Sequence, residues 1–164
     1  MEKQKLRVIF DSNVYGTMVE ENLDSLFKKI ELSKNIIVYG ANIIRKELRN
    51  TPKRLLHGRK NFRGILLYQY DSLVKDHELE INQIVEAIAV EYAKNYRGGI
   101  SKQQLKNDFL IVACASLHHL DIIVTGDKHS MFAKNAVAAY QKVNEQNDLR
   151  TPNFHSIEEM EKLL

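Results

Sequence analysis

Two aspartates stand directly after apolar runs of the chain, where their charge needs an explanation. Asp11 follows the run Leu6–Phe10, and Asp127 follows Asp121–Thr125 after one glycine. An ionised carboxylate at the end of a buried strand is costly to desolvate, so it must be solvated, cap a helix or bind a cation. Taken singly, Asp11 is as readily a helix cap, and Asp127 an ordinary turn residue. Two such aspartates together indicate a cation site more strongly than either one does alone.

Two further acids lie in expected helices. Asp108 falls about two turns into a helix predicted over 101–117, beside apolar neighbours such as Phe109. An unpaired charge near the core-facing edge of a helix is unfavourable, which favours a partner for Asp108. Glu47 falls in a helix predicted over 41–49, between basic residues. On pattern alone Glu47 is a solvated surface acid.

Carboxylates that converge without histidine or thiolate partners suit hard cations such as Mg²⁺ or Mn²⁺. Such ions activate a water and hold the oxygens of a phosphodiester for in-line displacement. The six histidines form no H-E-x-x-H motif, so we expect no zinc site. The only cysteine, Cys114, lies in an apolar run and is predicted to be a small core residue.

A basic segment spans residues 45–63. It holds eight Lys or Arg and one acid, a charge of +7, which leaves −4 for the rest of a chain whose net charge is +3. This distribution fits contact with a polyanion, and equally a solvated helix face with long side chains. The candidate phosphate contacts are Arg45, Arg49, Lys53, Arg54, Arg59, Lys60 and Arg63.

Length and composition indicate an ordinary globular protein. The 164 residues suit one domain over 1–164, and the 44% hydrophobic and 27% charged shares exclude a disordered or disulfide-scaffold protein. The first apolar run, Val8–Phe10, is too short for a signal peptide or a membrane span, so we expect a cytoplasmic protein with no membrane partner.

Hydrophobic periodicity predicts alternating strands and helices. Residues 11–14 are expected to be a loop, and residues 53–96 are expected to be mostly helical. Within them, the pattern of residues 68–74 fits either the end of a helix or a short strand. Such alternation favours a three-layer α/β/α sandwich around a mostly parallel sheet, which binds ligands at the carboxyl ends of its strands. The strands are expected at 6–10, 35–39 and 121–125, and further helices at 24–32, about 130–144 and after Ser156.

The successive motifs of the chain resemble those of PIN-domain nucleases. These motifs are Val8–Val14, the helix acid in Ile43–Leu48, Asn107–Ala115, Ile122–Asp127 and the segment Arg150–Phe154. Each motif alone is weak, whereas their order and spacing together are fairly specific. The chain has Lys128 and His129 where some members carry a further acid, which leaves the number of metals open.

The resemblance implies a PIN-like fold and cleavage of single-stranded RNA by a water activated by Mg²⁺ or Mn²⁺. It also implies that Asp11, Glu47, Asp108 and Asp127 are catalytic, metal-binding acids. By the same resemblance, Asn13 and Thr125 orient those acids. An RNA substrate would be the polyanion that the charge of the basic segment fits. Many small members are toxins of VapBC-type toxin–antitoxin pairs, so an antitoxin and a second copy of the chain are the expected protein partners.

Two alternatives remain. Phe10–Thr17 loosely resembles the opening motif of haloacid-dehalogenase-like phosphatases, but that chemistry needs a second Asp two residues after the first, where this chain has Asn13. Met131 likewise stands where that family has a later acid. The other alternative is a catalytically inactive PIN-like module that binds RNA or protein. The presence of all four acids argues against it.

Overall fold

The computed structural model describes residues 3–164 and is built around a five-stranded parallel sheet in the order β5-β2-β1-β6-β7. The central strand β1 pairs with β2 and with β6, so that Val8 lies opposite Val38 on one side and Ile122 on the other. Both faces of this strand are covered, which explains its continuous apolar run. The strands are β1 (Leu6–Phe10), β2 (Ile36–Ala41), β5 (Glu78–Leu79), β6 (Ile122–Val124) and β7 (Asn153–His155).

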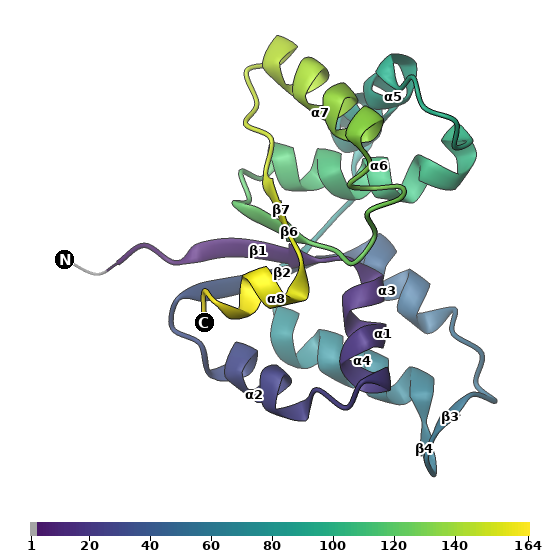
Figure 1. Cartoon of the computed structure of the whole chain (residues 1–164), viewed down its shortest axis with the longest axis vertical. Coiled ribbons are helices and arrows are strands. Elements are labelled where there is room, and N and C mark those ends of the chain that lie inside the picture. Colours follow the sequence, from purple (N-terminus) through teal and green to yellow (C-terminus); the bar gives the residue numbers. More distant parts are fainter. Residues whose placement is uncertain (1–2) are drawn as a thin grey trace.

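Helices cover both faces of the sheet, which confirms the expected three-layer α/β/α architecture. Figure 1 shows α5, α6 and α7 on one side and α1, α2, α3 and α4 on the other. The helices are α1 (Ser12–Glu20), α2 (Asp24–Leu32), α3 (Asn42–Arg49), α4 (Phe62–Val74), α5 (Gln83–Asn95), α6 (Lys102–Leu117), α7 (Lys134–Gln146) and α8 (Ile157–Glu161).

The helix α1 forms where we expected a loop. Its first backbone N–H, that of Ser12, donates to the side chain of Asp11, which caps the helix. The buried residues Val14, Tyr15 and Met18 recur at helical spacing and pack into the core. Burial of this face outweighs the weak helix propensity of the segment.

The middle of the chain is helical over α4 and α5, and residues 68–74 belong to α4. Three short strands interrupt it against expectation: β5, and the antiparallel hairpin of β3 (Leu56–His57) and β4 (Lys60–Asn61). The helix expected from about 130 begins instead at Lys134, since residues 128–132 form turns. Residues 153–155 form β7, which we did not predict. Strands of two or three residues carry too little local pattern to be recognised without their partners.

The core contains Cys114, which is fully buried in α6 as predicted. Gly40 in β2 lies against the ring of Tyr70, whose hydroxyl oxygen is 2.8 Å from a carboxylate oxygen of Glu78 and 3.1 Å from the carbonyl oxygen of Ala41, so that the two share its single proton. None of the helices formed by residues 3–164 has the length and apolar composition that crossing a bilayer requires.

Candidate functional site

Asp11 lies at the carboxyl end of β1 and is only 6% exposed. One carboxylate oxygen accepts from the backbone N–H of Ser12 at 2.8 Å, and the other accepts from the hydroxyl of Thr125 at 3.2 Å. Burial raises the pKa of Asp11 to about 6, and the charges of Glu47 and Asp127 add to the rise although the hydrogen bonds oppose it. The residue is therefore both a helix cap and a carboxylate with too little compensating positive charge.

Asp127 lies two residues beyond Thr125, after β6, and its backbone N–H donates to the Thr125 hydroxyl at 3.0 Å. Its carboxylate accepts from the backbone N–H groups of His129 at 2.9 Å and Ser130 at 3.0 Å, and from the Ser130 hydroxyl. Burial alone would raise the pKa of Asp127, but these hydrogen bonds outweigh it and hold the pKa below its ordinary value. Asp127 therefore stays ionised more readily than Asp11.

Glu47 projects from α3 into contacts with two other helices. The Ser12 hydroxyl of α1 donates to one carboxylate oxygen at 2.6 Å, and the Asn107 side-chain amide of α6 donates to the other at 2.8 Å. The surface reading of Glu47 therefore fails, because the side chain is half-buried and held by neutral donors from both sides of the sheet.

Asp108 comes from α6, one residue after Asn107, and is half-buried. Burial raises its pKa to about 7, and the charges of Asp11, Asp127 and Glu47 add to the rise. A hydrogen bond from Ser130 acts in the opposite direction. The charge of each acid is thus felt at Asp108, which places the four predicted residues around one region at the end of the sheet.

Within residues 3–164, no lysine or arginine side chain forms an ion pair with these acids. An all-oxygen, uncompensated set of carboxylates has the chemistry that Mg²⁺ or Mn²⁺ requires. As the side chains stand, no three His, Cys, Asp or Glu residues within 3–164 are arranged to hold a metal ion together. Hydrogen bonds reach both oxygens of Asp11, of Glu47 and of Asp127.

Asn13 and Thr125 both lie beside the acids. The side-chain oxygen of Asn13 accepts from the backbone N–H of Gly126 at 3.3 Å, and so links α1 to the loop that carries Asp127. Thr125 connects Asp11 to Asp127 through its single hydroxyl.

Sequence patterns did not predict three polar residues that donate hydrogen bonds to the acids: Ser12, Asn107 and Ser130. Ser12 and Asn107 each adjoin a predicted acid in the sequence, and that adjacency was the available signal. Nothing local distinguishes Ser130 from an ordinary turn residue.

The basic segment extends from α3 through the β3–β4 hairpin into α4. Arg45 is engaged by Asp71 through two hydrogen bonds of 2.9 and 3.0 Å, and the guanidinium of Arg63 donates to the carbonyl of Arg49 at 3.5 Å. Of the seven candidate phosphate contacts, those with exposed side chains are Arg49, Lys53, Arg54, Arg59 and Lys60. The first of them lies two residues from Glu47, so the segment leads from the acids onto the hairpin.

No protein-family model matches the chain, and no curated protein matches it. Solved structures do. VapBC2 from Rickettsia felis, bound to a DNA fragment from its promoter, contains a chain with a TM-score of 0.59 at 15% identity, over 92% of this chain and 98% of that one. FitAB bound to the IR36 DNA fragment gives 0.54 at 21% identity, over 92% and 94% of the two chains. FitAcB from Neisseria gonorrhoeae gives 0.54 at 22% identity, over 90% and 96%. The chain therefore has the PIN-like α/β fold of these VapBC2 and FitAB structures.

Proposed function

We propose that this protein is a metal-dependent endoribonuclease that hydrolyses phosphodiester bonds of single-stranded RNA. The observation that carries the proposal is the group of four mutually repelling acids, Asp11, Glu47, Asp108 and Asp127, with which no lysine or arginine side chain among the described residues forms an ion pair. Such a group gains most from a bound divalent cation. Its position at the carboxyl ends of β1 and β6 is the usual place for a ligand in a parallel sheet.

A bound Mg²⁺ or Mn²⁺ would lower the pKa of a coordinated water and polarise the phosphate under attack. The chain's own residues would bind the metal ion and orient its ligands. Asp11 and Asp108 are the acids with the most unfavourable charge, so they are the first candidates as ligands. Thr125 keeps Asp11 and Asp127 in fixed relation, and Ser12 with Asn107 directs Glu47 toward the same region. Groups that orient ligands in this way commonly affect metal affinity as strongly as some ligands do.

We further propose that the protein is the toxin of a toxin–antitoxin pair. The support is the fold shared with chains of VapBC2 and FitAB over more than nine-tenths of their length. An antitoxin would be a small protein encoded in the adjacent reading frame. Co-expression of that frame should yield a complex that survives gel filtration and suppresses RNA cleavage.

The nuclease proposal is tested by Asp11→Asn. The variant should abolish cleavage of single-stranded RNA in Mg²⁺ or Mn²⁺ and should weaken the rise in melting temperature that the metal causes, since a ligand of the native state stabilises it. Asp76→Asn is the matched control, because the Asp76 side chain is 91% exposed and lies outside the acidic group. Full cleavage by Asp11→Asn, or a parent protein whose melting temperature ignores saturating metal, would contradict the proposal.

A further inference from the structure

A column of three aromatic rings leads from the core to the surface beside the acids. The ring of Tyr140 in α7 stacks on Phe154 of β7, with centroids 5.9 Å apart and planes at 23°. Phe154 stacks on Phe132, with centroids 5.1 Å apart and planes at 15°. Tyr140 is fully buried, whereas Phe132 is 40% exposed. The column therefore ends in an aromatic ring that presents itself to solvent.

The exposed ring is held in place by the backbone of the acidic site. The backbone N–H of Phe132 donates to the carbonyl of Asp127 at 3.2 Å. The carbonyl of the preceding residue, Met131, accepts from the Tyr140 hydroxyl at 3.0 Å. An apolar ring on a surface turn gains nothing from this exposure in the isolated chain, since burying it would be favourable.

The column lies beside the strand that leads to Asp127 and two strands away from Asp11. The carbonyl of His155 in β7 accepts from the backbone N–H of Thr125 at 3.1 Å, and the Thr125 hydroxyl donates to Asp11. Neighbouring strands lie about 4.8 Å apart. Phe154 precedes His155 in the same strand, so the aromatic column lies beside the strand end that is followed by Thr125 and Asp127.

The groove beside the column is polar as well as aromatic. An open pocket of about 350 Å³, within the ~300–1,000 Å³ of small-molecule sites, has a lining that includes Phe132, Phe154, Gln141, His155 and the acid Glu159. The Nδ1 atom of His155 is buried and has no hydrogen-bond partner among residues 3–164. A buried polar atom without a partner is unfavourable, so it indicates a hydrogen bond that a ligand could complete.

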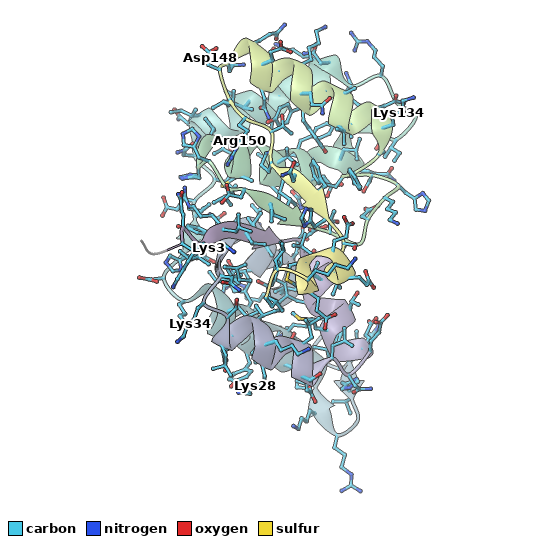
Figure 2. The ribbon with its side chains drawn as sticks, turned by 60° about the vertical axis from the view of Figure 1, so that its left-hand side comes forward. Lys3, Lys28, Lys34, Lys134, Asp148 and Arg150 are labelled. Atoms are coloured by element: carbon cyan, nitrogen blue, oxygen red, sulfur yellow. The ribbon has the colours of Figure 1, made fainter. Side chains whose placement is uncertain are left out.

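Two lysines adjoin Phe132 in the chain, whereas the wall of the pocket itself carries the carboxylate of Glu159. Lys128 and Lys134 are both exposed and lie within four residues of Phe132. Figure 2 shows the Lys134 side chain at the surface where α7 begins, on the side of the view opposite Lys3. An aromatic ring with flanking lysines is the combination by which proteins bind single-stranded nucleic acid.

We propose that this pocket binds one base of the RNA strand next to the scissile phosphate, with the base stacked on the outer face of Phe132. The inference rests on the proposed nuclease function and names a subsite of it. The base extends the aromatic column, and its edge reaches the groups of His155 and Gln141 that can donate or accept hydrogen bonds. Only an unpaired base can be presented in this way, which selects single-stranded RNA. The stacking face accepts any base, whereas the hydrogen bonds confer a preference.

The first test uses Phe132→Trp, made in the Asp11→Asn protein so that RNA survives the titration. The chain has no tryptophan, so this variant carries a single fluorescent indole at the proposed stacking position. A single-stranded RNA hexamer should quench its emission. A hexamer series with one abasic position each should lose the quenching at one position and keep it at the others. Absence of quenching by a hexamer that binds, or equal quenching across the whole abasic series, would overturn the proposal.

The second test measures affinity. Phe132→Ala and Phe132→Leu should both weaken hexamer binding roughly five- to a hundredfold, the range expected for one stacked base. Leucine keeps the site apolar, so a leucine variant with unchanged affinity would contradict stacking. The control is Leu32→Ala, which removes an apolar side chain that is 74% exposed at the end of α2, outside this pocket and outside the basic segment. Its affinity should remain within twofold of the parent.

The two proposals fail in distinguishable ways. If the parent protein neither binds nor cleaves single-stranded RNA, the proposed nuclease function is itself contradicted. Cleavage that depends on Asp11 together with unchanged binding by the Phe132 variants would leave the nuclease function standing and overturn the base subsite. A Phe132→Trp protein whose emission responds to a co-expressed partner protein and not to RNA would overturn it too, in favour of a protein contact.

Discussion

The side-chain amide of Asn107 donates a hydrogen bond of 2.8 Å to the carboxylate of Glu47, a residue 60 positions earlier in the chain. The contact joins α6 to α3 across the end of the sheet. The second oxygen of Glu47 accepts from Ser12 of α1, so three helices meet at one carboxylate. None of the three helices determines this contact by itself. We therefore expect Asn107 to position Glu47.

Asn107→Ala should lower kcat/KM for RNA cleavage about 10- to 100-fold, the usual effect of removing a group that orients a metal-site carboxylate. The side chain is exposed, so the free energy of unfolding should change by less than about 0.5 kcal/mol. Gln103→Ala, an exposed substitution on the same helix, is the control and should leave activity unchanged. If steady-state kinetics show both variants equal to the parent, Glu47 does not depend on this hydrogen bond.

Stability without metal should fall as the pH rises. The pKa of Asp11 is raised from 3.8 to about 6 and that of Asp108 to about 7, so the native state holds more protons than the unfolded state between about pH 4 and 7. The free energy of unfolding therefore decreases with pH across this window and levels off above it. Urea unfolding in EDTA at a series of pH values measures the effect.

Asp11→Asn identifies the source of that slope. The variant lacks the Asp11 charge, so its stability relative to the parent should increase from pH 4 to pH 6 and reach on the order of 2–3 kcal/mol. It should also bring the pKa of Asp108 closer to its ordinary value, because the Asp11 charge is one cause of the rise. A constant difference between the two proteins over this pH range would show that Asp11 does not titrate as the geometry requires.

The basic segment should contribute counterion release when RNA binds. For single strands the slope of log K against log salt is about −0.7 per neutralised phosphate, so replacing Lys53 and Arg54 by Ala should weaken binding and flatten the slope by roughly one unit. Both side chains are exposed. Binding is measured with the Asp11→Asn protein over a range of salt concentrations. The metal-induced thermal shift should stay unchanged.

Lys3 and Lys5 provide the matched control for this experiment. They precede β1, at the amino end of the strand whose carboxyl end carries Asp11, and Figure 2 shows where Lys3 lies. Their double substitution by Ala removes the same charge from the opposite edge of the sheet. Equal slopes for both double variants would mean that RNA approaches the acids over another surface.

Two glycines should respond to alanine in opposite directions. A Cβ atom at Gly40 would lie 2.6 and 2.8 Å from ring carbons of Tyr70, whose hydroxyl is tied to Ala41 and Glu78. Because this ring is buried and cannot move away, Gly40→Ala should lower stability by about 1–3 kcal/mol. A Cβ atom at Gly16 in α1 meets nothing within 4 Å, so Gly16→Ala should raise stability by about 0.5–1 kcal/mol. Chemical denaturation of both variants checks the two signs.

The sequence by itself was sufficient to predict the α/β architecture and to select the four acids as candidates. The strands 6–10 and 122–124 are short apolar runs that end in turn residues, and each is followed by an aspartate, Asp11 or Asp127. Parallel strands align their carboxyl ends, so local pattern sufficed to bring these two residues to one edge of the sheet. Periodicity sufficed likewise for α2 and α6, whose apolar faces are long enough to be recognised.

Only the tertiary structure decided how the site is held. Helix α1 was missed because its stability comes from the Asp11 cap and from burial of Tyr15 and Met18, which require the core to be present. The strand β7 has three residues, and its place beside β6 brings Phe154 onto Phe132. The hydrogen bonds to Glu47 and the aromatic column are contacts between distant segments. Local patterns cannot specify them, because they follow from strand register and helix packing.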